Sequence, residues 1–159
     1  MDKKLFRTGP YADFFSQGVQ VGNVLTLAGQ LGDTEDGSVP VEIKDQMINC
    51  YTNIKNVLSE FGATLDNVID ETWFVTDVNE CMENVSEIFR EREAIYGCKP
   101  EVSQTLVGIS ALVQRQYKLE IKVIAYLGLI DYFLIVLHYF WVISEFNTIV
   151  CLYQLVYIL

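Results

Sequence analysis

Residues 99–124, which read KPEVSQTLVGISALVQRQYKLEIKVI, indicate how the fold is completed. Pro100 marks the exit from a helix, and residues 105–109 contain β-branched side chains that favour a strand. Residues 117–125 then alternate between apolar and mostly charged side chains, which predicts a strand with one buried face. We therefore expect a closing pair of strands, with the carboxylate of Glu120 in the middle of the second strand.

A hairpin and a helix are predicted near the start of the chain. Apolar runs flank Gly22-Asn23, and two turn residues between such runs predict a β-hairpin whose second strand ends at residues 28–30. Apolar side chains at helical spacing then predict a helix over residues 43–61.

The order of the elements predicts the fold class. Residues 68–77 have the composition of a strand, and a second apolar stripe predicts a helix with Asn79 as its N-cap and its end at Gly97. The resulting order is strand, strand, helix, strand, helix, strand, strand. Right-handed crossovers place both helices on one face of one mixed sheet, so we expect an α+β fold. The other face keeps apolar side chains such as Phe74, which favours a homo-oligomer.

Composition and charge exclude several functional classes. The chain has 159 residues, of which 51% are hydrophobic, and its net charge of −10 disfavours a nucleic-acid partner. Its four cysteines lack metal-ligand spacing, and its first residues lack an apolar leader, so we expect a cytoplasmic protein with no metal site. The acids Asp33, Glu35 and Asp36 do not match a calcium loop, and His138, the only histidine, lies outside the predicted domain.

Several short pieces of sequence resemble one known family. In order, they are Gly9-Pro10-Tyr11, Ala28-Gly29-Gln30, Gln46 with Asn53, residues 72–77, Pro100, and Leu119-Glu120-Ile121. Over residues 6–126 they resemble the Rid family (reactive intermediate deaminases, also called YjgF or L-PSP). The resemblance implies a chorismate-mutase-like fold, a homotrimer, and clefts between subunits that bind small metabolites without a cofactor. Typical members hydrolyse imines or enamines to 2-oxo acids and ammonia.

The resemblance also implies a set of site residues. Glu120 and Tyr11 take the catalytic positions, although the residues alone equally allow a sheet-face acid and a packed turn tyrosine. The implied substrate-binding residues are Gly29, Ser103, Gln104 and Thr105.

The arginine that anchors a substrate carboxylate in the family is missing here. Ungapped alignment from Pro100 places Val102 in its slot, and alignment backward from Leu112 places Gln104 there. An amide can hydrogen-bond a carboxylate but supplies no charge. Arg115, in the following loop, is the alternative cation.

The last residues and the function each allow two interpretations. Residues 127–159 are mostly apolar and contain no Lys or Arg, so they are either a membrane anchor through residues 127–143 or a read-through extension of a domain over residues 1–126. The domain is either an imine deaminase or a non-catalytic small-molecule-binding or interaction protein on the same trimeric scaffold. Loss of the arginine favours the second function, or a substrate without a carboxylate.

Overall fold

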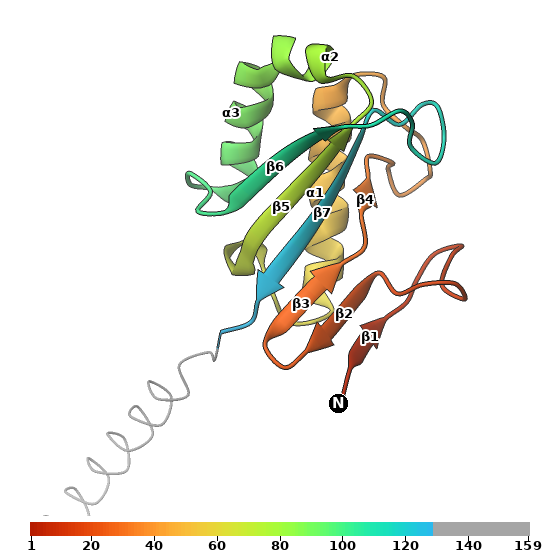
Figure 1. The fold of residues 1–159 in the computed structure, drawn as a ribbon, viewed down its shortest axis with the longest axis vertical. Helices are drawn as coiled ribbons and strands as arrows, with labels where there is room; N and C mark the ends of the chain where they lie inside the picture. The colour runs from red at the N-terminus through yellow and green to blue at the C-terminus, as the bar shows by residue number, and fades with distance from the viewer. Residues whose placement is uncertain (129–159) are drawn as a thin grey trace, which may run out of the picture. The chain divides into compact units, whose positions relative to one another are not determined.

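A mixed seven-stranded sheet forms the frame of the molecule in the computed structural model, which describes residues 1–128 (Figure 1). The strands are β1 (Lys4–Phe6), β2 (Gly18–Val21), β3 (Val24–Leu27), β4 (Gln30–Leu31), β5 (Val68–Val75), β6 (Ser103–Gly108) and β7 (Leu119–Tyr126). Their order is β1-β2-β3-β7-β5-β6, and β4 also pairs with β7. Only the β5–β6 pair is parallel among these strands.

The helices are α1 (Ile43–Ser59), α2 (Val78–Glu83) and α3 (Val85–Tyr96), and a short 3-10 turn, η1 (Leu65–Asn67), precedes β5. The α+β class and the shared helix face are confirmed, because α1 and α3 lie on the same side of the sheet (Figure 1). The side chain of Glu71 on β5 contacts both helices. The second predicted helix is divided at Asn84 into α2 and α3. Its N-cap is Asp77 rather than Asn79, because the Asp77 side chain accepts from the Asn79 and Glu80 N–H groups.

The hairpin at Gly22-Asn23 is confirmed by the antiparallel pairing of β2 with β3. The prediction that the last two strands pair with each other is wrong. Strand β5 lies between β6 and β7 and hydrogen-bonds to both. The reason is topological: β6 enters parallel to β5 at the edge of the sheet, and residues 109–118 carry the chain across to the other side of β5. Sequence periodicity carries no information on this order.

The apolar C-terminal segment, residues 127–159, lies outside the described residues except for its first two, so neither interpretation of it is tested. Within residues 1–128, no helix has the length and apolar character needed to cross a bilayer.

A buried carboxylate joins the helices to the sheet. Glu71 is fully buried and accepts hydrogen bonds from the Trp73 indole at 3.2 Å and from Arg92 Nη2 at 2.9 Å. Both of these donors contact Glu71 Oε2, and the Tyr96 hydroxyl donates to Oε1. The Tyr51 hydroxyl lies 2.9 Å from both carboxylate oxygens. Burial, and then the charge of Glu71, raises the pKa of both tyrosines, which keeps their hydroxyl groups protonated as donors.

Removing one partner of this network should destabilise the fold strongly. Arg92→Met leaves the Glu71 carboxylate buried without its cation, and we expect the free energy of unfolding to fall by about 3–5 kcal/mol. Urea denaturation measures this loss. The double variant Glu71→Leu, Arg92→Met should recover part of it, because no unpaired charge is then buried. The matched control is Glu87→Gln in the partly exposed Lys44–Glu87 pair, which should change the urea midpoint far less. An equally small effect of Arg92→Met would contradict the structural role of the network.

Candidate functional site

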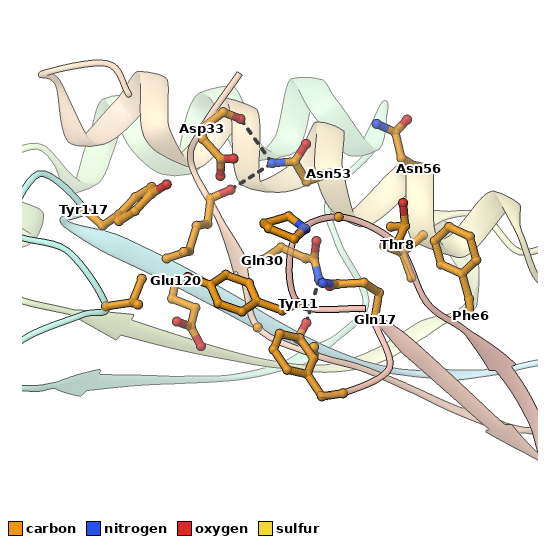
Figure 2. Close-up of a pocket in the computed structure, with 18 of the residues that line it drawn as sticks. Phe6, Thr8, Tyr11, Gln17, Gln30, Asp33, Asn53, Asn56, Tyr117 and Glu120 are labelled. Atoms are coloured by element: carbon orange, nitrogen blue, oxygen red, sulfur yellow. Dashed lines mark hydrogen bonds between the residues drawn. The ribbon is translucent and has the colours of Figure 1, made fainter. Parts of the chain in front are cut away.

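A pocket of about 820 Å³ lies where four segments of the chain meet (Figure 2). It is lined by the end of β1 and the loop after it, by the turn around β4, by the second half of α1, and by the loop that enters β7. Its walls therefore come from residues between positions 6 and 120, which only the folded chain brings together.

Three of the sequence-predicted site residues line this pocket: Tyr11, Gly29 and Glu120. Leu31 of β4 pairs with Glu120 of β7, which sets the β4 turn beside the carboxylate. The approach at Gly29 is so close that a Cβ atom there would overlap the Glu120 carboxyl group. A glycine is therefore required at this point for the carboxylate to lie against the backbone.

The other three predicted residues, Ser103, Gln104 and Thr105, lie on β6 and do not line the pocket. Gln104 pairs with Glu71, so it shares the helix-covered face of the sheet, and its Nε2 is buried without a hydrogen-bond partner among residues 1–128. Ser103 and Thr105 face the opposite side, which is also the side of Glu120.

Neither alignment supplies a cation to the pocket. Val102 packs against the hydrophobic core, and Gln104 faces the helices. Arg115 is exposed and is not among the lining residues.

Glu120 has the environment of a reactive carboxyl group. Half-burial raises its pKa above the ordinary value of 4.5, and the nearby Lys122 opposes this rise. None of the hydrogen bonds and ion pairs found in residues 1–128 involves its carboxylate, which is therefore available to a ligand or a water molecule. No group of three or more metal-ligating side chains occurs in that part of the chain.

Among the lining residues that sequence reasoning missed are Tyr117 and Asp33. Tyr117 falls on the apolar face of the predicted strand and resembles a core residue, whereas Asp33 lies in a turn predicted to be solvated. In the structure they lie close together at one end of the pocket (Figure 2), and Tyr117 is only 8% exposed. Burial, followed by the charge of Asp33, raises the pKa of the Tyr117 hydroxyl.

Two side-chain amides of α1, one partly and one fully buried, hold these residues in place. Asn53 donates to the carbonyl oxygens of Leu31 and Asp33 at 3.0 and 3.2 Å, which fixes the turn after β4. Gln46, fully buried, donates to the Gln116 carbonyl at 2.9 Å and accepts from the Lys118 N–H at 2.8 Å. The loop that carries Tyr117 is thereby fixed from both sides.

Gly29→Ala should displace the Glu120 carboxyl group toward solvent, because the added methyl group occupies its position. A more solvated carboxyl group has a lower pKa, so we expect the Glu120 pKa to fall toward 4.5 in the variant. Carbon-detected NMR titration of the side-chain carboxyl groups measures the change, with Glu120→Gln identifying the resonance. An unchanged titration of Glu120 in Gly29→Ala would contradict the packing described here.

Comparison with curated proteins identifies several relatives. The RutC family protein YjgH of Escherichia coli (strain K12) is 32% identical over 111 residues, which cover 70% of this chain and 81% of YjgH. A protein of the same strain named putative reactive intermediate deaminase TdcF is 29% identical over 121 residues, covering 74% of this chain and 86% of TdcF.

A solved structure and a family model agree with these relatives. The crystal structure of the YjgF gene product from E. coli matches with a TM-score of 0.68 at 24% identity, covering 77% of this chain and 98% of that protein, which shows the same fold. The family model described as Endoribonuclease L-PSP matches residues 8–127. The chain therefore belongs to the Endoribonuclease L-PSP family, the family that the sequence motifs resemble under its other names, Rid and YjgF.

Proposed function

We propose that this protein binds imines or enamines in the pocket around Glu120 and hydrolyses them to a carbonyl compound and ammonia. The observation that carries the proposal is the half-buried Glu120 carboxylate, held against the backbone at Gly29 and free of protein partners among residues 1–128. The name of TdcF, a putative reactive intermediate deaminase, supports the same reaction class.

The proposed reaction uses Glu120 as a base and proton carrier. A water oxygen attacks the C=N carbon, the π electrons move to nitrogen, and the carboxylate takes the proton from the water. Glu120 returns this proton to the nitrogen, which gives a carbinolamine. It then takes the proton of the new hydroxyl group and passes it to the amino nitrogen as the C=O bond forms and the C–N bond breaks, so that a carbonyl compound and ammonia leave. We assign to the Tyr11 hydroxyl the role of orienting the water or the nitrogen, because Tyr11 lines the same pocket.

A second candidate function is small-molecule binding without catalysis. The specific observation that favours it is the absence of Lys and Arg from the pocket lining formed by the described residues. Two charge-assisted hydrogen bonds from an arginine to a carboxylate contribute roughly 1.5–3 kcal/mol each. A 2-imino acid bound in this pocket would lack both of them.

An RNA substrate suits this pocket poorly, whatever the name of the family model. The lining carboxylates Asp33, Glu60 and Glu120 would repel a phosphate group, and the net charge of the chain is −10.

We further propose a homotrimer built from residues 1–126, with the helix-free face of each sheet against a neighbouring subunit. Thr72 and Phe74 lie on this face beside Glu120, and both are only half-buried in the single chain.

A cytoplasmic location fits the three described cysteines, Cys50, Cys81 and Cys98, which are free thiols. Anchoring through residues 127–143 is the alternative, and resistance of the full chain to carbonate extraction from membranes would support it.

The full chain should be a weak deaminase on 2-iminopropanoate. Without the arginine, we expect ammonia release to be roughly two to three orders of magnitude slower than that of TdcF measured under the same conditions. Glu120→Gln should abolish the remaining catalysis, whereas Glu87→Gln, remote from the pocket, should leave it unchanged. Residual activity should also fall as acid protonates Glu120, at a pH above 4.5, because its pKa is raised.

Turnover at the rate of TdcF would contradict the weak-deaminase prediction. Residual turnover that survives Glu120→Gln would remove Glu120 from the mechanism. Complete inactivity of the wild type on this substrate and on imines without a carboxylate would favour the binding function.

The assembly is tested by light scattering of the full chain in a mild detergent buffer. We expect a particle of three times the 18.2 kDa of one chain. Phe74→Lys places a charge on the helix-free face and should dissociate the trimer. Met82→Lys, on an exposed apolar residue of α2, is the matched control and should leave the mass unchanged. A monomeric wild type at micromolar concentration would contradict the proposed interface.

A further inference from the structure

The pocket has a pronounced charge asymmetry. Its lining includes three carboxylates, Asp33, Glu60 and Glu120, and no lysine or arginine of the described chain. Lys4 Nζ donates to the Glu60 carbonyl at 2.7 Å, and Arg7 donates to the Ala12 carbonyl at 2.8 Å. Lys122, whose charge acts on Glu120, lies two residues along β7 and is not among the lining residues. An anionic ligand would therefore meet like charge, and a cationic ligand would be attracted.

Two buried polar side chains of the lining each have an oxygen atom without a hydrogen-bond partner in residues 1–128, independently of these charges. Tyr117 is 8% exposed, and its hydroxyl forms none of the hydrogen bonds found in residues 1–128 (Figure 2). Gln30 is also 8% exposed. Its Nε2 donates to the Gln17 side chain at 3.1 Å and to the Ala28 carbonyl at 2.9 Å, which leaves its Oε1 without a donor.

These groups give the pocket an excess of hydrogen-bond acceptors. The three carboxylates accept only, the free oxygen of Gln30 accepts only, and a hydroxyl such as that of Tyr117 can accept as well as donate. The complementary ligand carries several N–H donors and a positive charge. An ammonium or iminium nitrogen has both properties.

Aromatic rings at the mouth of the pocket favour the same charge. Tyr11 and Phe15 both line it, and their rings stack with centroids 5.8 Å apart. Ring faces attract organic cations, and the apolar ring surface also binds the hydrocarbon part of such a ligand. A hydrated inorganic cation would gain only the electrostatic attraction of the carboxylates, and nothing from the aromatic rings.

We propose that this pocket selects small organic cations, either a protonated imine without a carboxylate group or the corresponding primary amine, and rejects 2-imino acids. The binding preference rests on the part of the lining that one chain supplies, whereas the turnover of the imine rests on the proposed function.

Calorimetric titration of the full chain with three probes of similar size tests the preference. The probes are benzylammonium, benzyl alcohol and phenylacetate. We expect benzylammonium to bind most tightly, benzyl alcohol about tenfold more weakly, and phenylacetate not detectably. Binding of benzylammonium should weaken in 0.5 M NaCl. Tightest binding of phenylacetate, equal binding of all three probes, or no binding of benzylammonium at millimolar concentration would overturn the proposal.

Charge-neutralising variants identify the groups responsible. Asp33→Asn and Glu120→Gln keep the shape of each side chain, and each should weaken benzylammonium binding about three- to fivefold. Glu87→Gln removes an equal charge outside the pocket and is the control for nonspecific electrostatics. A loss as large in Glu87→Gln, or none in the two pocket variants, would overturn the assignment. Competition by calcium chloride stronger than that of sodium chloride at equal ionic strength would replace the organic cation with a metal ion.

Turnover separates this inference from the proposed function. Imines released in the assay by an amine oxidase acting on benzylamine lack a carboxylate, and those released by an amino-acid oxidase carry one. Faster hydrolysis of the first class supports both proposals. Selective binding of benzylammonium without hydrolysis of either class leaves the cation preference standing and refutes the deaminase. Faster hydrolysis of the second class overturns the cation preference and keeps the deaminase.

Discussion

The hydrogen bonds of the buried Glu71 carboxylate hold the helices on one face of the sheet. Tyr51 of α1, Arg92 and Tyr96 of α3, and Trp73 of β5 itself all direct donors at this one group. A buried charge is tolerated only when it is paired and hydrogen-bonded, so α1 and α3 must dock together for Glu71 to be satisfied. The rest of the apolar core packs around this arrangement.

Glu120 carries a carboxylate on the opposite face of the sheet, in a different environment from that of Glu71. It pairs with Phe74 of β5, one residue from Trp73, and the pleat of the strand therefore turns its carboxylate away from the helices. No protein donor among the described residues reaches it, and Gly29 lets it lie against the backbone. One glutamate is thus held as part of the structure, and the other is available for chemistry because its side of the sheet has no helix layer.

The pocket around Glu120 depends on contacts made by the helix layer at its edges. Gln46 and Asn53 bond backbone groups of the two loops that carry Tyr117 and Asp33, so the rigidity of α1 is transferred to the lining. The lining that these loops complete contains the carboxylates of Asp33, Glu60 and Glu120 and, among the described residues, no lysine or arginine.

The sequence by itself determined most of the elements and, in the alternating strand over residues 117–125, the face on which each side chain lies. Periodicity identified the main strands and both helical regions, Gly22-Asn23 set the hairpin, and alternation in residues 117–125 separated Glu120 from the core. Only the tertiary structure decided that β5 lies between β6 and β7, that Gln104 faces the helices, and that Asp33 and Tyr117 meet Glu120 in one pocket. The physical reason is that periodicity records whether a position is buried, whereas strand order and the meeting of loops depend on pairings between residues far apart in the chain.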